Sequence, residues 1–443
     1  EEKILQRWLD DGTFEKSIDQ RPDDQEFTFN DGPPFANGLP HHGHLLTGYV
    51  KDVIPRYQAM KGNKVTRRFG WDCHGLPAEM EAEKELPVSG RASIIDYGIE
   101  EFNEHCRTSV LRYTNEWEKT VTRQARWVDF NHDYKTMDRD YMESVMWAFK
   151  ELWNKGLVYE AFRVMPYSWG AETPLSNFEI RLDDATRPRQ DPAVTVTFDL
   201  SPAEGDPGPM RILAWTTTPW TLPSNLALGV GPEVTYSLMQ DSDGTVFILG
   251  SEAIDRYSAQ LESTSEIGTI SGSDLVGRTY TPIFDFFADR EDAFKVLAAD
   301  FVDATEGTGV VHMAPGFGEE DQNLCESNGI FIGEVVPVDD QGQFTDAVPD
   351  WHGINVFEAN SEIIRTLKSS GHLIRHDTYE HNYPHCWRTD TPIIYKAISS
   401  WYVKVTDFRD QMVEINKDIN WIPDHVRDGR FGTWLSGARD WSI

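Results

Sequence analysis

Residues 30–50 read NDGPPFANGLPHHGHLLTGYV and join two predicted elements of secondary structure. Three residues with high strand propensity, Phe27-Thr28-Phe29, precede this loop and predict a short strand. Apolar residues then recur every three or four positions from Leu45 to Tyr57, which is the pattern of one helix face. Pro55 is expected to kink or shorten this helix, because proline has no backbone N–H. The stretch therefore predicts a strand, a glycine-bearing loop and a helix.

Two histidines, His41 and His44, stand at the predicted start of the helix. A helix N-terminus offers unpaired N–H groups and a partial positive charge, which suits a phosphate. We therefore expect both imidazoles to reach a triphosphate that lies over this helix end. A plainer alternative is that the histidines only cap the helix, and two histidines in one turn would also suit a metal. Against a metal, no Glu or Cys stands nearby at zinc-protease or zinc-finger spacing.

The whole run resembles the signature of class I aminoacyl-tRNA synthetases, whose His-Ile-Gly-His sequence corresponds here to His41-His42-Gly43-His44. A second run, GWDCHGLP at residues 70–77, resembles the isoleucine-specific members of that family. The resemblance implies a ligase that activates isoleucine with ATP and Mg²⁺ and transfers it to tRNA(Ile). It also implies that His41, Gly43 and His44 bind ATP, with the two histidines acting in catalysis.

Two further residues, Pro33 and Asp72, belong by this resemblance to the amino-acid site. Pro33 would lie beside the substrate, and Asp72 would bind the α-ammonium group of the amino acid. From the residues alone, Asp72 is equally well explained as the N-cap of a helix over Leu76–Met80.

The order of predicted elements around the loop favours a parallel sheet, because residues 64–70 (KVTRRFG) predict a second strand after the helix. Parallel sheets bind ligands at the carboxyl ends of their strands, where both informative loops fall. We therefore expect an α/β fold with a Rossmann-like parallel-sheet nucleotide-binding domain, of which this chain holds the first half. Residues 91–160 are expected to be helical, with aromatic faces in the core.

Short alternating segments beyond residue 190 predict strands, at 194–198, 212–215, 245–249 and 309–312. The family resemblance implies that they form a β-barrel-like editing domain inserted into the nucleotide-binding fold. A chain of 443 residues suits two or three domains. The expected parts are the first catalytic half with helical segments (1–165), a connector (166–189), the inserted editing domain (190–377), and the return connector with the start of the second catalytic half (378–443).

Two stretches of the expected insertion resemble editing motifs of the family, WTTTPWTLPSN at 215–225 and GTGVVHMAPGFGEED at 307–321. On the residues alone, the threonines suit an ordinary strand and the glycines suit tight turns. The resemblance implies that a water hydrolyses mischarged Val-tRNA(Ile), with hydroxyl donors stabilising the oxyanion. Such a step is needed because one methylene gives a hydrophobic pocket only ~1–3 kcal/mol, and the isoleucine–valine pair is the standard example of this limit. The implied editing residues are Thr216, Thr217, Thr218, Asn225, His312 at the amino-acid side chain, and Asp321 at its ammonium group.

The four cysteines, Cys73, Cys106, Cys325 and Cys386, form no Cys-x-x-Cys pair. A reduced cytoplasmic protein without disulfides is therefore expected. Some members of the family carry a zinc knuckle near residues 381–390, but here Thr389 stands at the second cysteine position. We predict no zinc, and we expect His385 and Cys386 to be packing residues.

The net charge of -32 argues against a general nucleic-acid binder, because phosphate contacts need Lys and Arg. Residues 51–68 differ, with six basic side chains against the single acid Asp52, so tRNA contacts are expected through local patches. No apolar run is long enough to cross a membrane, and no targeting signal is visible at Glu1. A soluble, cytoplasmic monomer is expected.

Two alternatives to a complete ligase remain open. In the first, the chain acts only as an aminoacyl-tRNA deacylase, because the editing motifs are complete whereas the family's Lys-Met-Ser-Lys-Ser motif does not occur in it. In the second, it is a non-enzymatic tRNA-binding paralogue, which intact His312 and Asp321 disfavour. A valine- or leucine-specific synthetase is a weaker competitor, because the run at 70–77 resembles the isoleucine-specific members.

Overall fold

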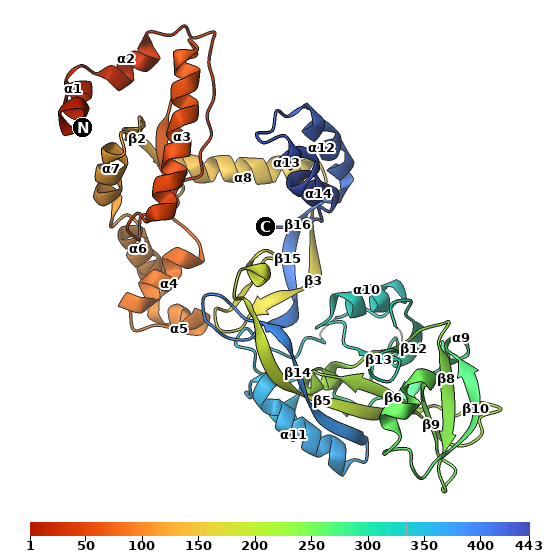
Figure 1. Cartoon of the computed structure of the whole chain (residues 1–443). Coiled ribbons are helices and arrows are strands. Elements are labelled where there is room, and N and C mark those ends of the chain that lie inside the picture. Colours follow the sequence, from red (N-terminus) through yellow and green to blue (C-terminus); the bar gives the residue numbers. More distant parts are fainter. Residues whose placement is uncertain (303, 334) are drawn as a thin grey trace. The chain divides into compact units, whose positions relative to one another are not determined.

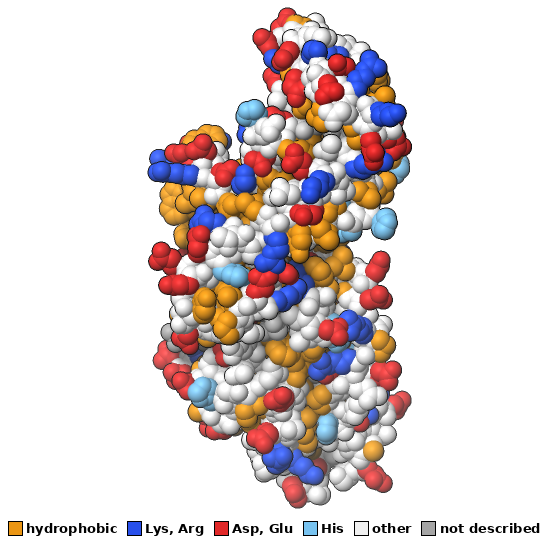
Figure 2. Space-filling view, turned by 90° about the vertical axis from the view of Figure 1, so that its left-hand side faces the viewer, with side chains coloured by type: hydrophobic (Ala, Val, Ile, Leu, Met, Phe, Trp, Pro, Cys, Tyr) orange, Lys and Arg blue, Asp and Glu red, His pale blue; other side chains and the backbone are white. Residues whose placement is uncertain are grey.

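The computed structural model describes residues 1–302, 304–333 and 335–443, and the chain forms two compact units, Glu1–Val158 and Tyr159–Ile443 (Figure 1). Acidic and basic side chains are interspersed over the face shown in Figure 2. Within the described residues, no helix has both the length and the apolar character needed to span a membrane.

The first unit is mainly helical. The prediction of helices over 91–160 is confirmed for α5 to α8, but it missed the strand β2 between them. The expectation that the aromatic faces lie in the core is wrong for α8, which has no buried residue and exposes Tyr141, Trp147 and Trp153. The elements are α1 (Glu2–Asp10), α2 (Thr13–Asp19), α3 (His42–Met60), β1 (Arg68–Trp71), α4 (Leu76–Glu85), α5 (Gly90–Tyr97), α6 (Ile99–Ser109), α7 (Thr114–Arg123), β2 (Asp129–Lys135) and α8 (Arg139–Asn154).

The two strands of the first unit, β1 and β2, run parallel, so the predicted parallel pairing is present in a two-stranded form. Gly70 faces Tyr134 across this pair, and a Cβ at Gly70 would lie 2.2 Å from the tyrosine ring. Two isolated parallel bridges, Glu26 to Lys64 and Phe35 to Asp72, join the loop before α3 to the residues that flank β1. The mixed α/β character is therefore observed, whereas a larger parallel sheet does not form among the described residues.

The predicted strand at Phe27–Phe29 is wrong, because these residues form no strand and only single bridges flank them. Pro33 and Pro34 follow closely and have no N–H for a sheet ladder. The predicted helix is confirmed as α3, but Pro55 does not shorten it. Arg67 Nη2 donates to the Pro55 carbonyl at 3.1 Å, whereas the carbonyl that proline leaves without its helical donor is that of Lys51, one turn earlier.

The second unit is mainly β-structure, and each of the four predicted strand segments overlaps a strand, namely β5, β6, β9 or β13, although β9 and β13 begin one residue later than predicted. Its longer elements are β3 (Val158–Ser168), β4 (Thr173–Pro174), β5 (Thr186–Leu200), β6 (Met210–Thr216), β7 (Ala227–Val230), β8 (Thr235–Gln240), β9 (Val246–Gly250), β10 (Ser265–Ser271), α9 (Gly272–Leu275), β11 (Tyr280–Thr281), β12 (Lys295–Ala298), β13 (Val310–Met313), α10 (Glu319–Ser327), α11 (Val356–Ser369), β14 (Leu373–Pro384), β15 (Ile394–Val403), α12 (Arg409–Ile415), α13 (His425–Asp428), α14 (Arg430–Ser436) and β16 (Trp441–Ser442).

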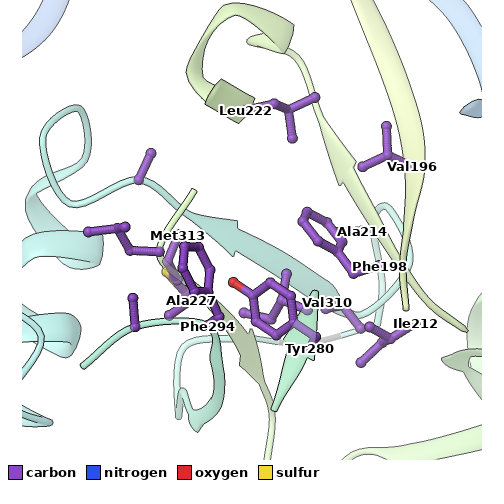
Figure 3. Packing of buried hydrophobic residues seen from close by; sticks show 14 of the residues in the cluster. Val196, Phe198, Ile212, Ala214, Leu222, Ala227, Tyr280, Phe294, Val310 and Met313 are labelled. Carbon is purple, nitrogen blue, oxygen red and sulfur yellow. The ribbon is translucent and has the colours of Figure 1, made fainter. Parts of the chain in front are cut away.

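Three sheets organise this unit. The largest has the order β10-β8-β9-β6-β5-β11 with β14 also paired to β5, and the others have the orders β12-β7-β13 and β16-β15-β3-β4. Buried side chains of the first two sheets meet in one core (Figure 3), where Phe198 and Ile212 of the larger sheet pack in the same cluster as Ala227 and Met313 of the smaller one. The smaller sheet is thereby fixed against the larger one, and both carry residues of the site described below.

Strands β5 and β14 form a long antiparallel ribbon, from the pair Thr186 and Pro384 to the pair Val196 and Leu373. The segment between them, which contains both editing-like motifs, therefore leaves and returns through adjacent strands.

Candidate functional site

The N-terminus of α3 is capped by the two histidines themselves. His41 is the N-cap residue, and its Nδ1 accepts the N–H of Gly43 at 3.1 Å. Nδ1 of His44 accepts the backbone N–H of His41 at 3.3 Å, and the two rings stack with centroids 3.7 Å apart. Because both Nδ1 atoms accept, each neutral ring carries its proton on Nε2. The histidines thus do cap the helix, and the Nε2–H groups of His41 and His44 both remain available to bind an anion.

The surroundings of His44 favour its neutral form. Partial burial lowers the pKa of His44, and the nearby His41 and Lys51 lower it further. Its ring centroid lies 4.7 Å from that of Trp117. The cavity beside it measures only ≈ 40 Å³, which is far too small for a nucleotide, so a triphosphate would have to lie over the exposed surface of His41 and Gly43.

Asp72 and the Pro33 loop are brought together. The backbone N–H of Asp72 donates to the Pro34 carbonyl at 2.9 Å, and the next residue, Phe35, forms the parallel bridge to Asp72. Helix α4 has Gly75 as its N-cap, so the alternative that Asp72 caps this helix is wrong. Its carboxylate has no hydrogen bond or ion pair with any residue that the structure describes, which leaves it available for a cationic group.

Three of the six basic side chains in the stretch 51–68 form ion pairs with acids. Lys51 pairs with Asp31, Arg56 with Asp52, and Lys64 with Asp23, so the stretch is a weaker attractor of RNA than its sequence indicates. Asp52 is a sequence neighbour, whereas the other two acids come from the preceding loop.

Within the second unit, three threonine hydroxyl groups form a hydrogen-bonded chain that starts at the end of β6. Oγ1 of Thr216 lies 3.2 Å from Oγ1 of Thr218, and that atom lies 3.2 Å from Oγ1 of Thr221, in the 3-10 turn Pro219–Ser224. The Thr221 hydroxyl donates to the Thr218 carbonyl at 2.9 Å. Thr217 is half-buried, and its hydroxyl has no hydrogen bond within the described part of the chain.

The hydroxyl chain ends on His312, which β13 supplies. Nε2 of His312 lies 2.8 Å from Oγ1 of Thr221, and Nδ1 lies 3.4 Å from Nδ2 of Asn225. Burial lowers the pKa of His312 to about 4, so the imidazole is neutral at physiological pH. On the far side of Asn225, Oδ1 accepts the Tyr280 hydroxyl at 2.6 Å.

Asp321 is the third residue of α10, and its carboxyl group lies close to Gly318, the N-cap of this helix. Its Oδ2 accepts the N–H of Ala314 at 2.8 Å. Burial of the carboxyl group raises its pKa to about 6, with Ala314 opposing this effect and Glu320 adding to it. Asp321 makes no ion pair with any described residue, so an ammonium group beside it would favour the carboxylate form.

The structure therefore joins Thr216, Thr218, Asn225 and His312 in one hydrogen-bonded network. Sequence reasoning missed Thr221 and Tyr280. Thr221 stands within the WTTTPWTLPSN stretch, where its hydroxyl was a usable signal. Tyr280 lies 55 positions from Asn225, and no local pattern indicates that contact.

Cys386 is buried beside hydroxyl groups rather than beside other candidate metal ligands. Burial acts to raise the pKa of the thiol, but hydrogen bonds from Ser168, Thr389 and the backbone outweigh it and lower that pKa. Nowhere in residues 1–302, 304–333 and 335–443 do three or more His, Cys, Asp or Glu side chains gather as a possible metal site.

Comparisons with known proteins give consistent findings. The family model described as tRNA synthetases class I (I, L, M and V) matches residues 3–443. The isoleucine--tRNA ligase of Rickettsia conorii is 60% identical over 449 residues, which cover 100% of this chain and 41% of that protein. That of Rickettsia felis is 58% identical over 460 residues, which cover 100% of this chain and 42% of that protein. The chain thus spans about two fifths of the length of these curated relatives.

Among solved structures, the crystal structure of GlLeuRS-CP1 is similar at 15% sequence identity and a TM-score of 0.34. The alignment covers 42% of this chain and 99% of that chain.

Proposed function

Because the chain belongs to the class I tRNA synthetases (I, L, M and V), we propose that it is the N-terminal part of an isoleucine--tRNA ligase. The whole protein would activate isoleucine with ATP and Mg²⁺, transfer it to tRNA(Ile), and hydrolyse mischarged Val-tRNA(Ile). The two relatives named as isoleucine--tRNA ligases match over the whole length of this chain, which supports the choice of amino acid.

In the synthetic site, His41 and His44 bind the ATP phosphates. Their Nε2–H groups and the backbone N–H groups at the start of α3, including that of Gly43, are the hydrogen-bond donors of this anion site. Asp72 binds the substrate ammonium group, and Pro33 lies beside the amino acid. The uncompensated carboxylate of Asp72 supports this role, because a cation is the partner it lacks.

In the editing site, Asp321 binds the ammonium group of the mischarged amino acid, and His312 contacts its side chain. Thr216, Thr217, Thr218 and Asn225 surround the adenosine and the ester. A water attacks the ester carbonyl, hydroxyl groups stabilise the oxyanion, and the bond to the ribose oxygen breaks to release valine and tRNA. The observations that carry this proposal are the network from Thr216 to His312 and the buried carboxyl group of Asp321, which bonds to the N–H of Ala314 but has no ion pair within the described residues.

The proposed domain organisation has the editing domain at 190–377, inserted between the catalytic parts 1–165 and 378–443 through the connector 166–189. The β5–β14 ribbon supports an insertion, because its two strands pair antiparallel across both proposed boundaries. We further propose that the parallel pair β1 and β2 belongs to a Rossmann-like sheet completed by residues outside this chain, and that the editing domain is barrel-like. The protein acts as a cytoplasmic monomer.

A deacylase acting alone is the second candidate. One observation favours it: every proposed editing residue lies within the unit Tyr159–Ile443. A non-enzymatic paralogue is disfavoured, because tRNA binding alone does not require the buried hydrogen-bonded network around His312.

Isoleucine-dependent ATP–pyrophosphate exchange tests the synthetic half of the proposal. The assay uses the longer polypeptide to which the chain belongs, with valine and leucine as competing amino acids. The proposal expects the highest kcat/KM with isoleucine. A preference for valine or leucine would refute the substrate, and absence of exchange with all three would refute the ligase.

A further inference from the structure

We propose that Tyr280 is a positioning residue of the editing site, which acts through Asn225 to hold His312 as the neutral tautomer protonated on Nε2. The inference rests on the proposed editing function for its effect on hydrolysis. Its effect on the imidazole can be measured without any substrate.

The phenol of Tyr280 lies in the shared core, in strand β11 (Figure 3). Its ring packs edge-to-face against Phe198 and Phe294, with centroids 5.3 and 5.9 Å away. Only 4% of the residue is exposed, and burial raises the pKa of the phenol well above its ordinary value. The hydroxyl therefore keeps its proton and donates it to Oδ1 of Asn225 at 2.6 Å.

The side-chain amide of Asn225 has one orientation that suits the groups around it, in which its two N–H hydrogens are shared among three acceptors. Nδ2 lies 2.9 Å from the Ala227 carbonyl and 3.5 Å from the Met313 carbonyl, and carbonyl oxygens can only accept. Oδ1 must then face Tyr280. This orientation turns an N–H of Nδ2 toward Nδ1 of His312, at 3.4 Å.

The orientation of Asn225 decides where His312 carries its proton. Nδ1 faces a donor and so remains unprotonated, which leaves the proton on Nε2, directed at Oγ1 of Thr221 at 2.8 Å. The hydrogen of the Thr221 hydroxyl goes to the Thr218 carbonyl. Both lone pairs of Oγ1 are then filled, one by His312 and one by the hydroxyl of Thr218.

In the opposite tautomer, Nε2 would become an acceptor and compete with the Thr218 carbonyl for the single hydrogen of Thr221. The directions of the hydroxyl groups from Thr221 to Thr216 would no longer be fixed. Tyr280, together with the carbonyls of Ala227 and Met313, thus fixes the orientation of Asn225 and with it the hydrogen-bond directions of the network, although Tyr280 does not touch the far end of that network. Preorganised hydroxyl directions matter because donors must already point at a developing oxyanion.

The test compares Tyr280→Phe with the matched control Tyr236→Phe. Tyr236 is also buried and donates to a carbonyl, that of Gly309 at 2.6 Å, outside the network. Nitrogen-15 NMR of histidine-labelled protein reports the tautomer of His312, whose signals are those absent from His312→Gln. Hydrolysis of Val-tRNA(Ile) is measured on the same samples.

We expect wild type and Tyr236→Phe to show unprotonated Nδ1 and protonated Nε2. Tyr280→Phe should show a mixture of both tautomers, and its kcat for hydrolysis should fall about tenfold, the usual size of one buried hydrogen bond. Asn225→Asp places an acceptor opposite Nδ1 and should protonate that atom. An unchanged tautomer in Tyr280→Phe overturns the inference, whatever the rate. Wild-type protein that does not hydrolyse Val-tRNA(Ile) overturns the proposed editing function instead, while the tautomer shift still decides the role of Tyr280.

Discussion

The imidazole Nε2 of His312 lies 2.8 Å from the hydroxyl of Thr221, although the two residues stand 91 positions apart in the chain. His312 lies on β13, which pairs antiparallel with β7, and β7 follows directly after the turn that contains Thr221. The sheet therefore brings the two editing-like motifs together. Through this contact, residues of the stretches 215–225 and 307–321, which are far apart in the sequence, lie next to each other in the structure.

Asp321→Asn should stabilise the folded chain at neutral pH while it abolishes Val-tRNA hydrolysis. Burial raises the pKa of Asp321 from 3.8 to about 6, so the folded state holds a proton that the unfolded state releases, and stability falls as pH rises between these values. The amide cannot ionise, which should gain on the order of 3 kcal/mol at pH 8 and little at pH 3.5. Urea unfolding at both pH values measures the difference. An equal gain at both would contradict the assignment.

Gly318→Ala should impair editing without removing any reacting group. A Cβ at Gly318 would lie 2.7 Å from Cγ of Asp321, so the carboxyl group must move. The φ of Gly318 is -136°, which any residue adopts, so the backbone itself is not strained. We expect Val-tRNA hydrolysis to fall at least about tenfold, since small misplacements of binding groups are costly. Gly268→Ala, with open space around its Cβ position, is the control and should keep the wild-type rate.

His312→Gln should flatten the pH dependence of stability on the acid side. Burial lowers the pKa of His312 from 6.5 to about 4, so the unfolded chain takes up this proton first. Stability from the neutral ring is complete above pH 6.5 and is lost as pH falls toward 4, at about 1.4 kcal/mol per pH unit. Asp321 acts in the opposite direction below pH 6, so the informative quantity is wild type minus variant. No difference in slope between pH 6.5 and 4.5 would count against a neutral buried ring.

Thr221→Val should cost both stability and editing. Valine has nearly the shape of threonine, but it leaves Nε2–H of His312 without its acceptor inside the protein. The free energy of unfolding should fall by about 1–3 kcal/mol. Thr195→Val is the matched control, because Thr195 is buried and bonds to the hydroxyl of Tyr257 outside the site. It should lose comparable stability and keep the hydrolysis rate. Equal rates in the two variants would remove Thr221 from the site.

His44→Ala in the longer polypeptide should lower isoleucine-dependent ATP–pyrophosphate exchange by about 10² to 10³, as expected for the loss of a donor to the transferring phosphates. His42→Ala, one position after the N-cap on the exposed surface, is the control and should exchange at the normal rate. If the two variants are equally active, His44 does not bind ATP.

Periodicity and alternation predicted the elements that present the site. The helix α3 and the strands β5, β6, β9 and β13 are all found, because regular secondary structure leaves a periodic pattern in the sequence. The apolar repeat of α3 is nevertheless exposed from Leu46 to Tyr57, so it does not mark a buried face among the described residues. Thr216 and His312 belong to one hydrogen-bonded network in the structure. Their proximity was expected, because both motifs resemble editing motifs of the same family.

The predictions that were wrong or incomplete have identifiable physical causes. Phe27–Phe29 has the composition of a strand but lacks continuous pairing among the described residues, and propensity alone cannot supply a partner. Pro55 removes one backbone hydrogen bond, and α3 nevertheless continues to Met60. Tyr280 joins the site through a contact between distant strands, and such a contact leaves no short-range signal.

The most direct test of the account measures hydrolysis of Val-tRNA(Ile) and Ile-tRNA(Ile) by the 443-residue chain, with Asp321→Ala beside it. The account predicts that wild type hydrolyses the valyl ester much faster than the isoleucyl ester, and that Asp321→Ala hydrolyses neither while retaining its circular dichroism spectrum. Equal hydrolysis of both esters, no hydrolysis of either by wild type, or a fully active Asp321→Ala would contradict it.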